Sequence, residues 1–547
     1  MDLSPQSARE HHFLDDVIRD AREAHAIKIK DEPSTLQESA DSYRRRRGRH
    51  PPPGFEKWFA RARKSRAVIA ESLFDQIYED LEPFWGVRPG NIRDSFESWT
   101  WTFRIRNEKI NNIPKGRFRS RVWGDMIQQV ARDLPDMDIA INPLDEPRVF
   151  VPWQEINELM TNASHYREHM ETLPLDSMLN NHNKLTAKGK LRAATGNWTT
   201  TGKLWPHVLD TFPPWKQQTS EDYGLLERGA NWTAAKDICS HHEWADMHGS
   251  LIKPATLSIT KSLVPIFSAA KLQGSNDILL PPPAYFTDDA LFTGKTWWGD
   301  GKTSTPWHEK LHGLVWRGKA TGGLVHASTW KTSHRQRLVS MLNASDTSLR
   351  YSDDAYEYPT TDGSKAPSHH RDSQALANWL DSIADSGFTD LLCTPSNSNK
   401  ACSSFSQHYS KVPAIAMKKQ YRWKYLPDID GNSLSGRFRA FMLSNSSPMK
   451  ATIFKEWHDS RLTPWVHFIP LDISLRDLWS TMAYFLGFGS GDDHDVEGER
   501  IATEGRLWAE RVLRKEDMLL YVHRVLLEYG RLCDDERDRL GYTDDLR

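Results

Sequence analysis

A run of three prolines divides the chain into two stretches of similar character. Pro281, Pro282 and Pro283 precede a passage rich in Gly, Thr, Ser and Trp at positions 293–306. On both sides of it, short apolar segments typical of strands alternate with helical patterns, as in α/β domains whose helices cover a sheet. A chain of 547 residues is also longer than one hydrophobic core usually serves. We therefore expect two α/β domains with a boundary near residue 290.

The two ends of the chain are expected to differ from these domains. Residues 1–54 are polar and carry an arginine run at positions 44–49. We interpret this stretch as a basic solvated stem and linker. The alternatives are a nuclear localisation signal or a patch that binds anionic surfaces. The tail predicts a helix with one apolar, core-forming stripe: Met518, Tyr521, Val522, Val525, Leu526 and Tyr529. The expected divisions are 1–54, 55–290, 291–485 and 486–547.

Composition excludes several classes of protein. Lys plus Arg number 71 and Asp plus Glu number 73, which argues against a nucleic-acid partner, because such proteins usually carry a strong basic excess. The 22 tryptophans suit stacking on sugar rings or the filling of large cores.

No run of 18 apolar residues and no signal-peptide pattern is present, so we expect membrane contact only through an anchor absent from this chain. Cys393 and Cys402 could pair or stay as thiols.

Ligands of open α/β sheets bind beyond the carboxyl ends of strands, and three segments in such positions carry reactive side chains. In the first, residues 142–148 (NPLDEPR) follow a short predicted strand at 139–141. Asp145 stands between two prolines that restrict its movement, which suits a general base acting on a hydroxyl. The alternative is a loop cap or an ion pair with Arg148.

The second segment is a glycine-rich loop after a predicted strand at 314–316. Residues 316–323 (WRGKATGG) predict backbone N–H groups that converge on an anion, or else a turn without a ligand. Ser333 is expected to cap the next helix, which places Arg335 and Arg337 in its first turn. Two cations there oppose the helix dipole, so a bound diphosphate would explain their position.

The third segment, residues 428–439 (DIDGNSLSGRFR), repeats this pattern. Ser433 or Ser435 is expected to cap a helix with Arg437 in its first turn, completing a two-arginine diphosphate clamp. Asp428 and Asp430 also resemble a metal-binding DxD motif, although the residues that follow do not have the spacing of an EF-hand calcium loop.

A histidine cluster offers a weaker alternative. His241 and His242 are adjacent, and His248 follows shortly after. Adjacent histidines on a strand point to opposite faces, and no HExxH pattern occurs. We therefore interpret them as a polar surface or a wall of the substrate site. A metal-dependent phosphoesterase that uses these histidines with the DxD aspartates remains the alternative.

Taken in order, these segments resemble the family 90 glycosyltransferases, which include fungal capsule-associated xylosyltransferase-type proteins and the animal protein O-glucosyltransferases. The resemblance runs from residue 48 to the C-terminus and is closest to the fungal branch. It rests on residues 48–55 (GRHPPPGF), 316–318 (WRG), 321–323 (TGG), 334–339 (HRQRLV), 424–425 (KY), 428–433 (DIDGNS), 435–439 (SGRFR), 455–457 (KEW) and 464–470 (PWVHFIP).

The resemblance implies a GT-B fold, with two Rossmann-like domains facing a cleft and C-terminal helices crossing back to the first domain. Residues 55–290 would form the acceptor side and residues 291–485 the nucleotide-sugar domain. It implies an inverting transfer from a UDP-sugar, xylose or glucose, to a glycan or glycoprotein hydroxyl, with Asp145 as the catalytic base. The donor and phosphate contacts it implies are Arg317, Gly318, Thr321, Gly322, Arg335, Ser435 and Arg437.

Cofactor, compartment and activity follow from the same resemblance. The resemblance implies a reaction that requires no metal, and it leaves open whether Mn or Mg stimulates the reaction. It implies the lumen of the Golgi or the endoplasmic reticulum, although relatives usually carry a signal or anchor that this chain does not show. Lys319 and Ala320 stand where Ser or Thr is more usual, which could alter the fit of the donor. A non-catalytic carbohydrate-binding protein of the same fold is the competing hypothesis.

Overall fold

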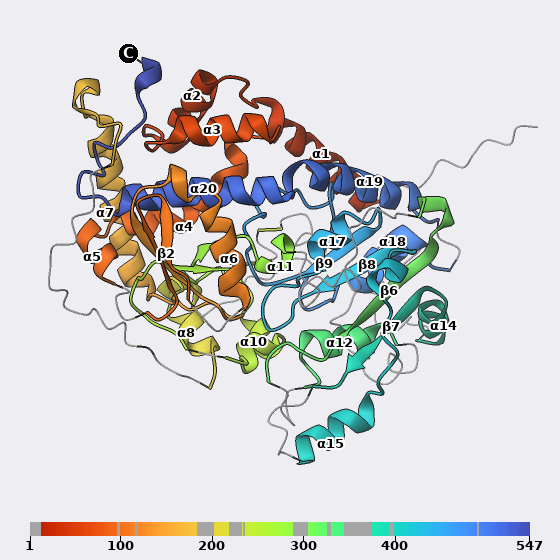
Figure 1. Ribbon diagram of the computed structural model, residues 1–547. Helices are drawn as coiled ribbons and strands as arrows, with labels where there is room; N and C mark the ends of the chain where they lie inside the picture. The colour runs from red at the N-terminus through yellow and green to blue at the C-terminus, as the bar shows by residue number, and fades with distance from the viewer. Residues whose placement is uncertain are drawn as a thin grey trace, which may run out of the picture.

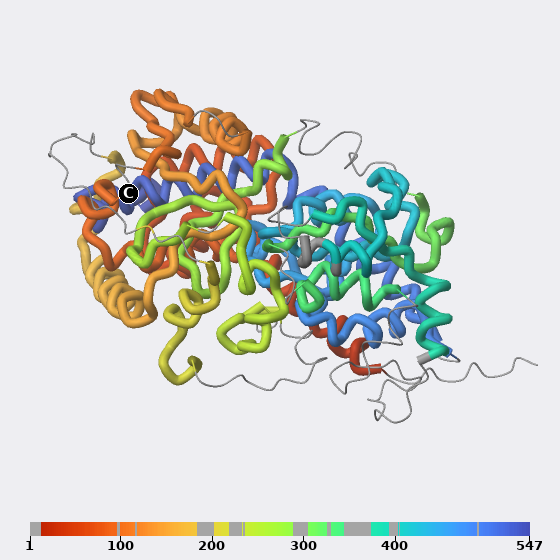
Figure 2. Tube along the Cα trace, turned by 90° about the horizontal axis from the view of Figure 1, so that it is seen from below, coloured from red at the N-terminus to blue at the C-terminus, as the bar shows by residue number. Residues whose placement is uncertain are grey.

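The computed structural model describes residues 12–95, 99–114, 118–182, 198, 202–217, 232–233, 236–256, 258–287, 305–324, 330–343, 373–392, 399–489 and 492–546. Two five-stranded sheets lie in two halves of the molecule, which are seen side by side in Figures 1 and 2. Both sheets are mostly parallel and covered by helices, so the prediction of an α/β fold with two sheets is confirmed. Strand β3 (Met137–Ile141), strand β6 (Leu311–Lys319) and helix α12 (His334–Met341) form where the sequence predicts them.

The first sheet has the order β2-β1-β3-β4-β5. Its bounds are β1 (Thr102–Arg106), β2 (Lys109–Asn112), β3, β4 (Ile266–Ser268) and β5 (Ile278–Leu279). The hairpin of β1 and β2 is antiparallel, and β3, β4 and β5 are parallel to one another. The carboxyl end of β3 leads directly into the loop that carries Asp145.

The second sheet is parallel throughout, with the order β10-β9-β8-β6-β7. Its strands are β6, β7 (Ala384–Asp390), β8 (Trp423–Ile429), β9 (Ser447–Ala451) and β10 (Ile469–Leu471). The chain moves from β6 to β7 on one side of β6, and β8 then occupies the other side. The direction of winding therefore reverses between β6 and β8.

Helices surround both sheets. They are α1 (Phe13–Lys30), α2 (Leu36–Arg47), α3 (Phe55–Lys64), α4 (Asp75–Trp85), α5 (Pro89–Asp94), α6 (Phe118–Gln128), α7 (Trp153–Glu171), α8 (Trp205–Leu209), α10 (Gly249–Ile252), α11 (Pro283–Phe286), α12, α14 (Ser373–Ile383), α15 (Asn399–His408), α16 (Met417–Gln420), α17 (Phe438–Met442), α18 (Leu478–Leu486), α19 (Asp495–Val512) and α20 (Lys515–Leu532). Among the helices of the first half, α7 is the longest element, and the β1–β2 hairpin lies between α5 and α6.

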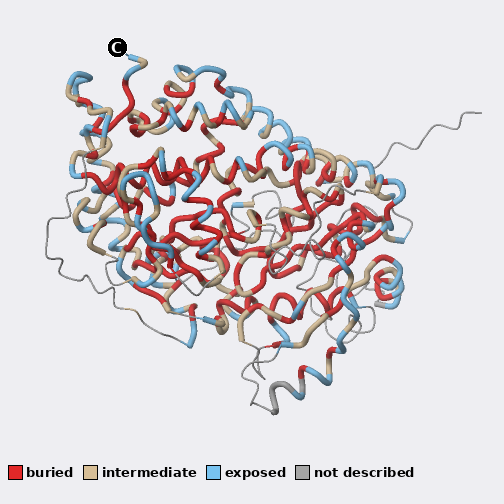
Figure 3. Tube along the Cα trace, viewed as in Figure 1, coloured by how far each residue is buried: buried red, intermediate tan, exposed pale blue. Residues whose placement is uncertain are grey.

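The last two helices lie end to end across both halves (Figure 1). Helix α19 contacts β9, α17 and α18 of the second half, whereas α20 contacts α3, α4, α6 and α11 of the first half. The apolar stripe predicted for α20 is buried throughout, from Met518 to Tyr529 (Figure 3). Many tryptophans fill the cores in the same way, among them Trp58, Trp123 and Trp457.

The interpretation of residues 1–54 as a solvated stem is wrong. From residue 12 onward this stretch forms α1 and α2, and several of its arginines bind the folded protein. Arg44 pairs with Asp545 at 2.6 Å, and Arg47 donates to Glu71 at 2.9 Å while lying over the ring of Tyr78. Because these partners lie far away in the sequence, the run is a set of packing contacts that local patterning cannot reveal.

A buried ion network fixes α20 to the first half. Arg524 is fully buried, donates to Glu71 at 3.0 Å and to the hydroxyl of Tyr78 at 2.8 Å, and lies close to Glu528. Burial opposes its charge, but Glu71 more than offsets this effect and raises the pKa of Arg524. Burial likewise favours neutral Glu528, but Arg531 outweighs it and lowers the pKa of Glu528 to about 2.

We predict that Arg524→Met lowers the free energy of unfolding by about 3–5 kcal/mol, because it removes a buried cation that Glu71 and Glu528 share and breaks the network. Arg500→Met is the matched control, since Arg500 pairs with Glu497 at a partly exposed site where such pairs contribute less than about 1 kcal/mol. Urea unfolding followed by circular dichroism measures both. Equal losses in the two variants would contradict a stabilising role for the buried network.

Candidate functional site

The candidate site lies where the winding of the second sheet reverses, between the carboxyl ends of β6 and β8. Arg335, in the first turn of α12, spans this point. Its guanidinium donates to the carbonyl of Lys319 after β6 at 2.9 Å, to the carbonyl of Asp430 after β8 at 2.7 Å, and to the hydroxyl of Thr321 at 2.5 Å. Crevices at such reversals are the usual ligand sites of open α/β sheets.

Arg437 approaches the same point from the other side. It donates to the carbonyl of Arg317 at 2.6 Å. Both guanidinium groups lie near the indole of Trp316, with Arg335 at 5.8 Å and Arg437 at 5.4 Å from the ring centroid. The structure therefore brings together the two arginines that the sequence singles out and adds Trp316, whose role the sequence does not reveal.

The two arginines carry positive charge that nothing in the described chain neutralises directly. Among the described residues, no carboxylate lies within ion-pair distance of either guanidinium. Burial, and then the charge of Arg437, lower the pKa of Arg335 to about 9, and burial lowers the pKa of Arg437. Like charges held together in a poorly solvated place favour an anionic ligand.

Gly318 allows this close arrangement. A Cβ atom there would lie 2.7 Å from the ring of Trp316 and 2.9 Å from a guanidinium nitrogen of Arg437. A side chain at this position would force the ring and the cation apart. The structure thus gives Gly318 a steric reason to be glycine.

The glycine loop does not offer free N–H groups, contrary to the expectation from its sequence. The amides of Gly322 and Gly323 donate to the side-chain oxygen of Asn432 at 3.1 and 3.2 Å. Asn432 satisfies them because its loop after β8 lies beside the glycine loop. The positive charge at this place therefore comes from the guanidinium groups of Arg335 and Arg437.

Two further predicted donor contacts are placed differently from the expectation. The side chain of Arg317 turns toward β7 and binds the carboxylate of Asp385 at 2.5 Å and the carbonyl of Pro413 at 3.2 Å. Ser435 does not cap a helix, because α17 begins only at Phe438 with Arg437 in the capping position. Ser435 is buried beside Arg437, and its carbonyl accepts from the hydroxyl of Tyr285 at 3.1 Å.

Asp145 lies beyond the carboxyl end of β3 and is about one-third exposed. Its carboxylate forms an ion pair with Arg119 of α6 and not with Arg148, which binds Asn142 at 3.0 Å. The neighbouring Glu146 is fully buried. Asp145 is therefore accessible on a loop that its neighbours hold in place.

Backbone contacts connect the Asp145 loop with the glycine loop. Glu146 accepts from the amides of Ala255 and Thr256 at 2.9 and 3.0 Å. The same segment, through the carbonyl of Lys253, accepts from the amide of Leu324 at 2.8 Å. Residues 249–256 therefore join the loop of the candidate base to the loop that contacts Arg335.

His241 and His248 are fully buried and His242 is half-buried, so the interpretation of these histidines as a polar surface is wrong. His241 stacks on Trp244 with ring centroids 4.1 Å apart. His248 stacks on His334 at 3.9 Å and lies 3.2 Å from the carboxylate of Asp430. Burial lowers the pKa of His248 well below its usual value, so the ring is neutral. Within the described residues no group of three His, Cys, Asp or Glu side chains is arranged to hold a metal ion; Cys393 lies outside them.

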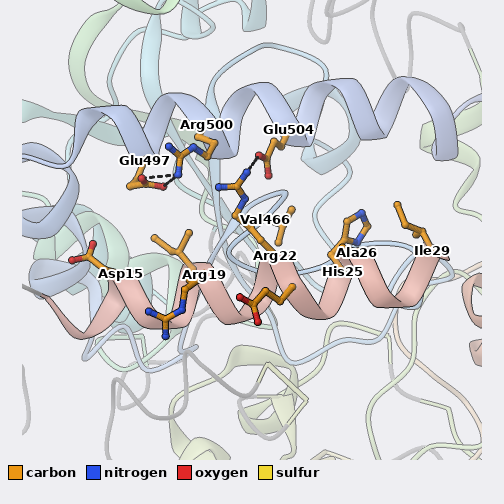
Figure 4. Close-up of a pocket in the computed structure, with 12 residues that line it drawn as sticks. Asp15, Arg19, Arg22, His25, Ala26, Ile29, Val466, Glu497, Arg500 and Glu504 are labelled. Carbon is orange, nitrogen blue, oxygen red and sulfur yellow. Dashed lines mark hydrogen bonds and ion pairs between the residues drawn. The ribbon is translucent and has the colours of Figure 1, made fainter.

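A separate cavity of about 690 Å³ lies between α1 and α19 (Figure 4). Its apolar floor includes Ile18 and Ile29. Arg22 pairs with Glu504, and Arg500 pairs with Glu497, each at 2.8 Å. Because these cations are already neutralised, the cavity lacks the electrostatic character of the site around Arg335.

Comparison with known proteins supports a glycosyltransferase. The sequence model described as Glycosyl transferase family 90 matches residues 392–539, which is less than half of the chain. That range contains Arg437 and Ser435 but not Asp145 or Arg335. In the parts of the chain that the structure describes, no helix is long and apolar enough to cross a bilayer.

Curated relatives match over short stretches. Protein O-glucosyltransferase 3 of Rattus norvegicus is 28% identical over 132 residues, which cover 23% of this chain and 25% of that protein. Protein O-glucosyltransferase 2 of Danio rerio is 28% identical over 20% of this chain and 21% of that protein. The O-glucosyltransferase rumi homolog of Aedes aegypti is 26% identical over 26% of this chain and 35% of that protein. The chain thus matches about a fifth to a third of the length of these relatives.

The burial of Asp430 makes the stability of the folded protein depend on pH in a way that can be measured. Its pKa rises from 3.8 to about 7, chiefly because burial disfavours the charged form. In the unfolded chain the carboxyl loses its proton near pH 4, whereas the folded chain keeps it up to about pH 7. Stability contributed by the neutral carboxyl is therefore complete at low pH and is lost as the pH rises through this window.

We predict that Asp430→Asn removes this dependence. The amide keeps an acceptor for His248 and for the backbone amide of Ile453 but does not titrate. The free energy of unfolding of the wild type, relative to the variant, should fall between about pH 4 and pH 7 and stay level above that. Urea unfolding at several pH values measures it, and parallel curves for the two proteins would contradict the assignment.

Proposed function

We propose that the chain is a family 90 glycosyltransferase of GT-B arrangement that transfers a sugar from a UDP-sugar to a hydroxyl of a glycan or glycoprotein. The observation that carries the proposal is the pair of guanidinium groups of Arg335 and Arg437 beside Trp316, without a carboxylate counter-ion among the described residues. The match to the family over residues 392–539 supports it.

The two arginines would stabilise the leaving group. Negative charge grows on the diphosphate as the bond to the sugar breaks, and fixed cations in a poorly solvated crevice stabilise that charge strongly. They supply charge that a divalent cation provides in other enzymes, so the proposed reaction requires no metal. Titration with Mn and Mg during the assay tests whether either ion stimulates it.

Asp145 would act as the general base. A carboxylate at the end of β3 is suited to accept the proton of an acceptor hydroxyl as that oxygen attacks the anomeric carbon. Attack on the face opposite the departing UDP inverts the configuration. Arg119 would hold the carboxylate in its orientation through their ion pair.

The donor sugar is proposed to be glucose or xylose. The printed names of the relatives favour glucose, whereas the resemblance to the fungal branch favours xylose. Hydrolysis of UDP-glucose, UDP-xylose and UDP-galactose by the purified protein would separate these donors. By the same resemblance, we propose that the enzyme works in the secretory pathway, in the lumen of the Golgi or the endoplasmic reticulum.

The diphosphate site is tested by Arg437→Met. Loss of a charged hydrogen-bond donor should weaken UDP binding about 10- to 100-fold. Arg317→Met is the matched control, because the side chain of Arg317 binds Asp385 and Pro413, and its affinity for UDP should remain that of the wild type. Isothermal titration calorimetry measures both variants. Equal affinity of all three proteins would refute the proposed clamp.

The role of Asp145 is tested by Asp145→Asn, which should keep UDP binding and lower the transfer rate about 100- to 10,000-fold. Asp138→Asn is the control, since Asp138 lies on the same strand, β3, and pairs with Arg106 at 2.7 Å. Release of UDP in the presence of acceptor measures transfer. A wild-type protein that binds glycans but transfers no sugar from any donor would favour the non-catalytic hypothesis.

A further inference from the structure

Asp428 lies on β8, beside β6, and Arg437 donates to the carbonyl of Arg317 on β6, yet no ion pair joins Asp428 and Arg437. The aspartate is buried near the carboxyl end of β8, and its carboxylate binds the ammonium group of Lys450 at 3.2 Å. Burial lowers the pKa of Arg437, and the negative charge of Asp428 opposes that decrease. The two charges therefore attract each other across a separation longer than an ion pair.

Lys450 owes its position to the register of the sheet. It stands on β9 directly opposite Asp428 on β8. Its ammonium group lies between Asp428 and Glu456, which is 3.1 Å away, and 4.0 Å from the centre of the Phe438 ring. Lys450 is thus held on two sides by carboxylates and on a third by an aromatic face.

Glu456 anchors this arrangement from the side away from Asp428. It accepts from the hydroxyl of Tyr285 at 3.0 Å and lies 3.3 Å from His458. Burial favours the neutral acid, but Lys450 outweighs it and lowers the pKa of Glu456 to about 2. Glu456 therefore stays charged and keeps Lys450 in place.

Removing Lys450 would leave Asp428 buried without its counter-ion. A buried carboxylate is costly unless it is paired, and Arg437 is a cation close enough to interact with it. The pair Asp428–Arg437 would then form and neutralise the guanidinium that is available to a diphosphate. The present geometry prevents this, because Lys450 binds the carboxylate first.

We propose that Lys450 is a positioning residue that holds Asp428 away from Arg437 and so keeps the diphosphate site open. The inference rests on the proposed function, because it concerns the affinity of that site for a nucleoside diphosphate. It identifies a residue that need not touch the donor and nevertheless controls its binding.

The test compares UDP binding, by calorimetry, in the wild type, Lys450→Met and the double variant Lys450→Met/Asp428→Asn. We expect Lys450→Met to weaken binding at least about tenfold, as for loss of a charged contact, and the double variant to return to within about threefold of the wild type. Lys455→Met is the control, since Lys455 pairs with Glu79, and its affinity should not change. A double variant as weak as Lys450→Met overturns the proposal, because a purely structural role would not be rescued.

Asp428→Asn alone keeps the test decisive if Lys450→Met does not fold. The single variant should bind UDP at least as tightly as the wild type, because the carboxylate that competes for Arg437 is gone. Binding more than about tenfold weaker, the size of a lost charged contact, overturns the proposal by assigning Asp428 a direct role. If the wild-type protein does not bind UDP, the proposed function itself is refuted. If the wild type binds UDP but the variants do not behave as described, only the role of Lys450 is refuted.

Discussion

The candidate site depends on one buried guanidinium that joins two neighbouring parallel strands. Arg335 donates to backbone carbonyls at the end of β6 and just after β8, so it joins the two strands between which the sheet reverses its winding. Carbonyl oxygens satisfy its hydrogen-bonding capacity without cancelling its charge. The same contacts that stabilise the sheet edge therefore leave a cation in the crevice, and the fold and the proposed chemistry have a common cause.

The arginines of α20 show what burial does when a carboxylate is present. Arg524 and Arg335 are both buried, yet the pKa of Arg524 is raised by Glu71, whereas the pKa of Arg335 is lowered by burial and by Arg437. The first arginine completes a closed ion network, and the second belongs to a cluster with surplus positive charge. Burial alone does not distinguish a structural arginine from a ligand-binding one; the identity of its neighbours does.

The sequence predicts the local elements well and the long-range partners poorly. Strands β3 and β6 follow from short apolar segments, helix α20 from its apolar stripe, and helix α12, with Arg335 in its first turn, from the cap expected at Ser333. The packing of the arginine run at 44–49 does not follow from the sequence, because its partners include Glu71 and Asp545. Likewise, Asn432 accepts from the amides of the glycine loop, and Asp385 pairs with Arg317. Both contacts join parts of the chain that only the assembled sheet brings together. Such pairings depend on register and chain crossing, which composition and spacing do not encode.

The two halves approach each other closely where Gly249 meets Gly322. A Cβ atom at Gly249 would lie 1.5 Å from the carbonyl oxygen of Gly322, so the two backbones approach without any side chain between them. The amide of Leu324 and the carboxylate of Glu146 then fasten the same segment, residues 249–256, to both loops. A short, hydrogen-bonded bridge therefore connects the loop of Asp145 with the loop that contacts Arg335. The proposed base and the proposed leaving-group clamp would need such a bridge, because orientation between reacting groups accounts for much of what an enzyme supplies.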